Sequence, residues 1–599
     1  MQVKKFFIRS ALSLFVILSL NFPFVTVTAQ DIITSDDIAS GASVFVFRES
    51  SKKPQVKMSS KKTFVATRSG RRSSAGRKNT QIAAVSRKKP ASARPSPSLR
   101  RNSKIALSNT LTAKADGYLE KKQIDLAIKT YREALVNNPK NQAAAHGLSD
   151  ALTAKGIETA GDAKSETSVP FFTEAVKYDE SNAVAYANLG EVHFANDRSE
   201  EAILNYEKAL AVAPSLSEIY APLGLAYVKN GNIARAEELL SKADAAGRSE
   251  IETEYLRGLI FFKQNKNQEA LAAFNAVIAR DPEHVLAHYY QAAVYDRLNQ
   301  RDSSVAALKK TTEIDPGFAP AYFDLGVTYY NEGEYDHAEN AYKQTVKIES
   351  GNAEAHANLA STHRQQEHFV EANAEYKLAA EHGINNDADL FSEWGFCLGK
   401  VNEWDKAVAR LQTASEIRPD ESVYTNLGWA HFNAGQNLEK KQKESEAGAE
   451  YEKSKLALKK AVEINPGYAA AHLNLGSTHN ALGEFQEAVN ALNRAVSLKS
   501  DWVIAINELG LAYRGLNDLA RAVQQFQRAV SLDDNFALGF YNLGETEYKR
   551  GNKKAAKKAQ ERLKKLDPAL AQRLDNVIAG RLIDAGKQKI RNKIPRLPF

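Results

Sequence analysis

The sequence predicts an all-α protein, an α-solenoid in which antiparallel helix pairs stack into a superhelix. Three observations predict this fold. Small residues return at intervals of 34 along most of the chain, with a second small residue twelve positions before nearly all of them. A bulky side chain follows most of the small residues by four positions. The intervening segments are rich in helix-forming residues, with apolar residues three and four apart. A fixed period of this length is typical of stacked repeats.

The two series of small residues explain how each helix pair closes. The later residue of each unit falls at Ala202, Ala236, Ala270, Ser304, Ala338 and Ala372, and again at Ser454, Ala488, Ala522 and Ala556. The earlier residue falls at Gly190, Gly224, Gly258, Ala292, Gly326, Ala360, Gly476, Gly510 and Gly544. Small residues where two helices cross let the backbones approach closely, and bulky residues beside the crossing fill the remaining space.

Composition excludes several classes of protein. The chain has 599 residues, of which 43% are hydrophobic and 25% charged, and its mean hydropathy is −0.43. These values exclude a polytopic membrane protein and a chain that is disordered throughout. Its single cysteine, Cys397, excludes an intramolecular disulfide and a zinc site made of several thiolates, and its apolar surroundings predict a small core residue.

The first element, residues 1–29, reads as a signal peptide. Lys4, Lys5 and Arg9 precede an apolar run, and small residues lead up to Ala29. We expect cleavage there and export to a periplasm or to the outside of the cell. The absence of disulfides favours a bacterial envelope. The alternative is an uncleaved membrane anchor, although Asn21 and Pro23 interrupt the apolar run before it reaches the roughly 20 residues of a spanning helix.

The second element, residues 30–104, is predicted to be a disordered basic tether. Residues 51–104 contain 17 Lys and Arg and no acidic residue, and their apolar residues show no period. Such a segment is expected to attract anionic lipid or envelope polymer, whereas nucleic acid is disfavoured because export separates the chain from it. The candidate anion-binding residues are Lys52, Lys53, Lys61, Lys62, Arg71, Arg72, Lys88, Lys89, Arg100 and Arg101. Alternatives are a solvated linker and a tether that lies back on residues 105–599, whose net charge is −9.

The third element, residues 105–568, carries the repeats. Residues 183–216 show the full pattern: Tyr186, Leu189, Gly190, Ala202, Tyr206, Ala209 and Pro214. This pattern resembles the tetratricopeptide repeat, a helix-turn-helix unit of 34 residues, and about 13 units fit it. An irregular unit lies near residues 142–182. A charged, helix-prone insertion near 435–452 is expected to lengthen one helix pair, either as a tolerated extension or as a binding feature. Residues 569–599 predict a capping helix and a basic tail.

The resemblance implies a concave surface lined by the first helix of each unit, and in some family members an asparagine ladder there holds an extended peptide. The equivalent asparagines are Asn188, Asn358, Asn426, Asn474 and Asn542, and Asp324, Glu393 and Glu508 occupy the same register. Pro222, Leu256 and Tyr290 interrupt the ladder, so peptide binding is expected mainly in the C-terminal half. We expect Tyr290 and Trp429 to face inward as aromatic anchors. The alternative is that Asn-Leu-Gly is only a frequent sequence motif of the repeat, without a role in binding.

The sequence offers no catalytic constellation. His284 and His288 are four apart and share a helix face, whereas His363 and His368 are five apart and are predicted to point to different faces with the turn between them. Neither pair has a third ligand of defined spacing. Phosphate loops, nucleophile elbows and metalloprotease motifs are absent from the sequence. We therefore expect no enzyme, no cofactor and no metal.

Together these features predict a non-enzymatic scaffold that binds a protein or peptide on the concave face of the solenoid outside the cytoplasm. The alternative is an envelope-retention protein that binds anionic polymer or lipid through the basic tether. Self-association through an exposed solenoid end is compatible with both functions. The sequence does not identify the partner.

Overall fold

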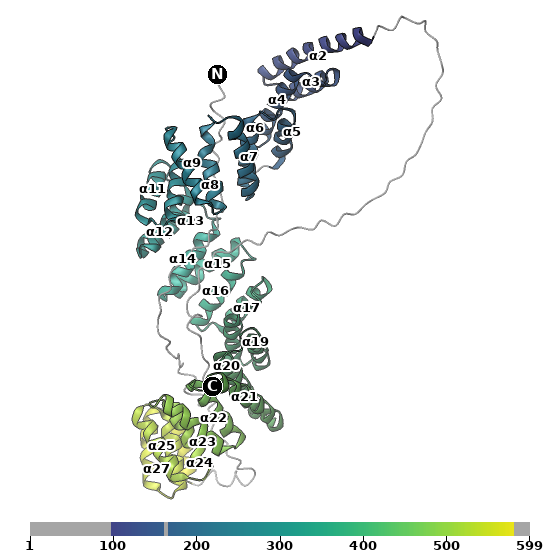
Figure 1. Cartoon of the computed structure of the whole chain (residues 1–599). Helices are drawn as coiled ribbons and strands as arrows, with labels where there is room; N and C mark the ends of the chain where they lie inside the picture. The colour runs from purple at the N-terminus through teal and green to yellow at the C-terminus, as the bar shows by residue number, and fades with distance from the viewer. Residues whose placement is uncertain (1–96, 161–165, 580–599) are drawn as a thin grey trace, which may run out of the picture. The chain divides into compact units, whose positions relative to one another are not determined.

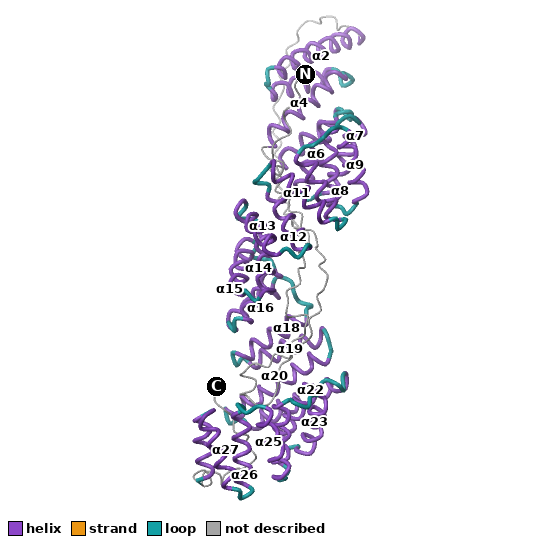
Figure 2. The backbone as a smooth tube through the Cα atoms, turned by 90° about the vertical axis from the view of Figure 1, so that its left-hand side faces the viewer, coloured by secondary structure: helices purple, strands orange, loops and turns teal. Residues whose placement is uncertain are grey.

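The computed structural model describes residues 97–160 and 166–579 (Figure 1), and its helices divide into two compact units, with the boundary in the chain between Ala321 and Tyr322. The predicted signal peptide, residues 30–96 of the predicted tether and the basic tail lie outside the described residues. Within the described ranges every regular element is a helix and no strand occurs, as Figure 2 shows. The prediction of an all-α fold is confirmed.

The first unit is a series of helix pairs, each helix of which also contacts the next one along the chain. Its helices are α2 (Pro97–Glu120), α3 (Ile124–Asn137), α4 (Gln142–Ala160), α5 (Val169–Tyr178), α6 (Ala183–Ala195), α7 (Ser199–Val212), α8 (Tyr220–Lys229), α9 (Ile233–Ala245), α10 (Ile251–Lys263), α11 (Asn267–Arg280), α12 (Val285–Arg297) and α13 (Arg301–Ile314). Two short 3₁₀ helices, η2 (Glu166–Ser168) and η3 (Ser217–Ile219), precede α5 and α8.

The second unit continues the same arrangement. Its helices are α14 (Ala319–Glu332), which begins just before the boundary, α15 (Tyr335–Ile348), α16 (Ala353–Gln365), α17 (Phe369–Glu381), α18 (Ala388–Lys400), α19 (Trp404–Ile417), α20 (Glu421–Lys440), α21 (Glu444–Ile464), α22 (Ala469–Leu482), α23 (Phe485–Leu498), α24 (Val503–Gly515), α25 (Leu519–Leu532), α26 (Ala537–Lys549), α27 (Lys553–Leu566) and α28 (Pro568–Ile578). The last helix, α28, contacts α26 and α27 and buries Leu570 and Leu574 there.

Glycines mark the points where the two helices of a pair cross. A Cβ atom placed on Gly510 of α24 would lie 2.6 Å from the ring of Phe526 on α25, and one on Gly190 of α6 would lie 2.7 Å from Tyr206 on α7. Real side chains do not approach this closely, so only glycine fits where the aromatic ring lies flat on the facing helix. The small and bulky residues of the sequence pattern therefore contact each other directly.

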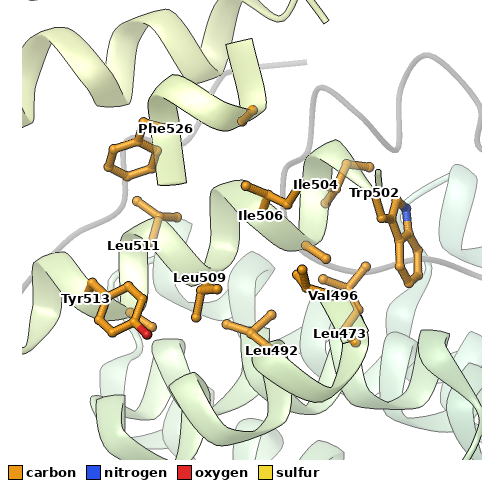
Figure 3. Packing of buried hydrophobic residues seen from close by; sticks show 14 of the residues in the cluster. Leu473, Leu492, Val496, Trp502, Ile504, Ile506, Leu509, Leu511, Tyr513 and Phe526 are labelled. Carbon is orange, nitrogen blue, oxygen red and sulfur yellow. The ribbon is translucent and has the colours of Figure 1, made fainter. Parts of the chain in front are cut away.

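The hydrophobic core runs between the pairs as well as within them. In Figure 3, Leu509 and Leu511 of α24 lie between Leu492 of α23 and Phe526 of α25. All four side chains are buried. Each first helix thus packs on the second helix of its own pair and on the pair before it, as a stack of repeats requires.

A common turn joins the two helices of most pairs. Its last residue donates a backbone N–H to the carbonyl five positions earlier, as His368 does to His363 at 2.8 Å and Glu484 to His479 at 2.9 Å. The residue before it has a left-handed backbone, with φ values of 62° at Glu367 and 76° at Gly483. The side chains at the two ends of this turn therefore lie next to each other.

Two parts of the chain differ from a regular repeat. Helix α2 begins at Pro97, inside the segment that the sequence predicted to be tether up to residue 104. Proline suits the first turn of a helix, and α2 is anchored further along where the Ser108 hydroxyl donates to Ala134 O at 2.8 Å. Helices α20 and α21 are 20 and 21 residues long, and Gly435 packs on Tyr451 in their extended part.

None of the helices in the described ranges combines the length and the hydrophobicity needed to cross a lipid bilayer.

Candidate functional site

Three of the five ladder asparagines are buried by neighbouring helices. The exposed fraction of Asn426 is 2%, and Asn474 and Asn542 are fully covered. Asn542 on α26 donates its Nδ2 to Asn507 Oδ1 on α24 at 2.9 Å. First helices of successive pairs pack on each other in the C-terminal half and cover these three positions, so peptide binding by the ladder stays a prediction, without an open surface at Asn426, Asn474 and Asn542.

The other two ladder positions are only half-buried. Asn188 on α6 donates its Nδ2 to Val184 O at 2.8 Å, one turn earlier on the same helix, and its surroundings are open. Asn358 on α16 is partly exposed as well. The two residues lie in different compact units.

The predicted aromatic anchors belong to the core, which corrects the expectation that they face a ligand. Tyr290 is 1% exposed, and its ring lies 5.6 Å from that of Phe262 and 5.8 Å from that of Phe274. Trp429 is 4% exposed and packs edge-on against Trp404, with 5.4 Å between ring centroids. In both places a large ring fills the space among packed helices instead of lining an open surface.

A polar layer therefore lies inside the C-terminal repeats. Asn480 on α22 donates its Nδ2 to Glu508 Oε2 on α24 at 3.2 Å, and Glu508 is 1% exposed. Burial raises the pKa of Glu508 to about 8, although Asn480 and Arg514 act in the opposite direction. The carboxyl group is consequently protonated at neutral pH in the folded chain.

We expect the stability of these repeats to fall as the pH rises. The unfolded chain releases the proton of Glu508 near its ordinary pKa of 4.5, whereas the folded chain keeps it until about 8, so this stabilisation is lost between those values. Glu508→Gln resembles the protonated form and removes this dependence. Relative to wild type, the variant should gain about 2–3 kcal/mol in unfolding free energy between pH 5.5 and pH 8. Urea denaturation at both pH values measures the gain. The exposed control Glu561→Gln should show none, and a parallel response of wild type and Glu508→Gln would contradict the prediction.

A buried ion pair occupies another ladder position. Arg364 at the end of α16 donates from Nε to Glu393 Oε2 on α18 at 3.2 Å, and the Tyr376 hydroxyl of α17 donates to the same oxygen at 2.5 Å. The side chains of Arg364 and Glu393 are 6% and 5% exposed. The carboxylate thus connects three consecutive helices inside the stack.

An open groove lies at the N-terminal end of the first unit, and sequence reasoning missed it. It has a volume of 770 Å³ and is lined by Leu107, Leu111, Asp125, Ile128, Lys129, Arg132, Glu133, Val136, Asn137, Leu152 and Phe171. Helices α2, α3, α4 and α5 contribute these residues. Val136 is 80% exposed, and it stands where later units have Ala211, Ala245 and Ala279, which is the sequence signal that could have indicated the groove.

The groove combines an apolar floor with a charged rim. Leu152 and Ile128 are buried beneath it, while Lys129 and Glu133 stand exposed beside it. Arg132 forms a two-pronged ion pair with Glu174 of α5, with N–O distances of 2.7 and 2.8 Å, and so is held in place at the edge. A surface of this kind accepts aliphatic side chains from a partner whose flanks carry charges.

The candidate anion-binding residues fall almost entirely outside the described residues. Lys52, Lys53, Lys61, Lys62, Arg71, Arg72, Lys88 and Lys89 all do. Arg100 and Arg101 are the fourth and fifth residues of α2, and the Arg101 side chain is exposed.

The two histidine pairs differ in their surroundings. His284 caps α12, where its Nδ1 accepts from Ala287 N at 3.1 Å, and His288 Nε2 lies 3.0 Å from Pro282 O. His363 and His368, by contrast, lie close to Glu339 of α15, with one ligand atom of each within 4.8 Å of the others. The prediction that His363 and His368 diverge is wrong, because the turn reverses the chain between them.

Cys397 on α18 is a core residue, as its apolar neighbours predicted. It has no exposed surface, and burial raises the pKa of its thiol.

Family models describing a tetratricopeptide repeat match residues 255–317, 319–352, 449–507 and 507–571. The chain contains tetratricopeptide repeats. A model for subunit 3 of the anaphase-promoting complex, or cyclosome, also matches residues 195–277.

Solved structures show local similarity to this tetratricopeptide solenoid. YrrB, described as a TPR protein with an unusual peptide-binding site, is 22% identical over 34% of this chain and 97% of its own, with a TM-score of 0.29. A chain of the APC/C hetero-tetramer Cut9-Hcn1 is 15% identical, and the match covers 81% of this chain and 99% of the other, with a TM-score of 0.34. A tetratricopeptide repeat protein from Parabacteroides merdae is 16% identical, and the match covers 44% of this chain and 98% of the other, with a TM-score of 0.35. No curated protein matches the chain.

Proposed function

We propose that this chain is a non-enzymatic scaffold that binds a partner polypeptide in the groove of α2, α3, α4 and α5. Tetratricopeptide solenoids are architectures of protein–protein interaction, and the matched family models describe repeats rather than a catalytic domain. The groove is the observation that carries the proposal, because it presents exposed Leu107 and Val136 above a buried aliphatic floor. The partner is an amphipathic helix or strand that places aliphatic side chains there.

The scaffold acts outside the cytoplasm in this proposal. Support comes from residues 1–29, where a basic start, an apolar run and small residues before Gln30 follow the pattern of a signal peptide. A second function is retention in a bacterial envelope, by attraction of anionic lipid or polymer to the 17 basic residues between 51 and 104. The two functions are compatible, since most of the basic run precedes α2, and the groove residues of α2, Leu107 and Leu111, follow the run.

Charge introduced into the groove should abolish partner binding. The chain without residues 1–29 serves as bait for an envelope extract, and the polypeptide it captures is then purified and titrated against variants. Val136→Asp and Leu107→Asp should each weaken binding at least tenfold, because a carboxylate replaces an apolar contact. Both side chains are exposed, so the fold is kept. Val370→Asp, at an aliphatic residue of α17 whose exposed fraction of 68% lies between those of Leu107 and Val136, is the matched control and should bind like wild type.

The same experiment separates the two functions. Binding that Val136→Asp and Leu107→Asp leave intact would contradict the groove. If that binding is released by raised salt, the retained material is held by the basic residues, as envelope retention requires.

A further inference from the structure

The turn between α16 and α17 places three metal-ligating side chains together. His363 is the last but two residue of α16, His368 is the N-cap of α17, and Glu339 comes from α15, the second helix of the preceding pair. The His363 and His368 rings are 6.0 Å apart between centroids. Glu339 Oε2 lies 4.0 Å from His363 Nδ1. Three consecutive helices therefore direct two imidazoles and one carboxylate at a common point.

His363 lacks the hydrogen bond that a buried imidazole needs. It is only 4% exposed, and its Nδ1 has no hydrogen-bond partner although the nitrogen is shielded from solvent. Leaving a buried polar atom unpaired costs roughly 1–3 kcal/mol, so such an atom in a folded protein calls for an explanation. The atom points toward the carboxylate but lies too far from it for a direct hydrogen bond. A cation between them would satisfy both groups.

The turn between α22 and α23 has the same place in its repeat and shows which side chains can pair there. Lys455, His479 and Glu484 have the same spacing in the sequence as Glu339, His363 and His368. There His479 Nδ1 lies 2.5 Å from Glu484 Oε2, and the Lys455 ammonium donates to Glu484 Oε1 at 2.8 Å. This turn thus contains its own cation. The turn at His363 and His368 has the same frame with a carboxylate in place of the lysine and a histidine in place of the glutamate.

We infer that Glu339, His363 and His368 bind a divalent transition metal of the Zn²⁺ class. Imidazole nitrogens with one carboxylate oxygen are a ligand set of zinc sites, and three protein ligands leave a fourth position open. Lys343 pairs with Glu339 through Oε1 and Gln366 also bonds to this carboxylate, while Oε2 is the oxygen that lies nearest His363 Nδ1. His368 is exposed and can rotate to close the shell. The metal would link α15, α16 and α17 across the boundary of two repeats.

Titration of the full chain with ZnCl₂ tests this site. The untagged protein is stripped with a chelator and studied by calorimetry, with bound metal counted by mass spectrometry. We expect one tight equivalent in wild type. His368→Ala removes an exposed ligand, and His363→Tyr introduces the residue type that other repeats have at the equivalent positions Tyr329 and Tyr513. Both variants should therefore keep the fold and bind zinc at least tenfold more weakly than wild type.

His146→Ala is the matched control. His146 is exposed and pairs with Asp179, with 2.6 Å between Nδ1 and Oδ2, and among the described residues this pair is not part of a cluster of three ligand atoms within 4.8 Å of one another. This variant should bind zinc like wild type. Co²⁺ replaces Zn²⁺ as an optical probe, and the absorption of a four-coordinate site should appear in wild type and vanish in His368→Ala. Absence of a tight equivalent in wild type, or its persistence in His368→Ala, would overturn the inference.

Discussion

Phe526→Ala should lower the free energy of unfolding of the C-terminal repeats by about 3–5 kcal/mol. The ring is fully buried on α25 and lies flat on α24 at Gly510, so its removal leaves a cavity at the crossing of the pair. The glycine cannot fill that space, because it has no side chain. Urea denaturation followed by circular dichroism measures the loss. Leu532→Ala on the same helix is the control, since this side chain is 47% exposed, and it should cost less than about 1 kcal/mol. Equal losses in the two variants would contradict the packing argument.

Arg364→Met should destabilise the second unit by about 3–5 kcal/mol, because it leaves the buried carboxylate of Glu393 without its cation. The pair is enclosed, and Tyr376 adds a hydrogen bond to the same oxygen. Methionine keeps most of the volume, so the loss reports the charge rather than a cavity. Thermal unfolding and urea denaturation measure it.

A double-mutant cycle isolates the interaction of this pair. The variant with Arg364→Met and Glu393→Gln should be more stable than the sum of the two single effects predicts, since glutamine carries no charge that needs a partner. Lys377→Met removes a positive charge from an exposed side chain of α17 and should change stability by less than about 0.5 kcal/mol. Strict additivity of the two substitutions would show that the pair is not coupled.

The pairing of helices could be predicted from the sequence because it depends on local contacts. Gly510 and Phe526 meet within one repeat, so their spacing in the chain already encodes their contact. The same holds for Gly190 and Tyr206. A repeated register multiplies this information, since every unit supplies the same evidence again.

The accessibility of the ladder could not be predicted in the same way. Asn188 and Asn474 have the same place in the repeat, yet one is half-buried and the other fully covered. The difference depends on how closely successive first helices pack, which is set by side chains of neighbouring units rather than by the motif itself. Tyr290 and Trp429 are core residues for the same reason. The groove was missed because it is a property of four helices at once, and only the unusual valine at position 136 indicates it.

The histidine pair shows a different limit of sequence reasoning. Spacing along one helix separates His363 from His368, but the left-handed residue Glu367 reverses the chain and brings their rings together. The third member, Glu339, is 24 positions before His363, so only the stacking of pairs brings it near.

The turn that joins most pairs has an evolutionary consequence. Its backbone hydrogen bond, such as the one from His368 to His363, holds two side chains next to each other whatever their chemistry. Tyrosine with aspartate, histidine with glutamate and histidine with histidine all occur at these positions, at Tyr513 with Asp518, His479 with Glu484, and His363 with His368. Substitutions there do not disturb the glycine crossings that hold the pairs together. The side chains of one turn can therefore change without a change in the other turns. A single turn can in this way gain a new property while the packing of the helix pairs stays the same.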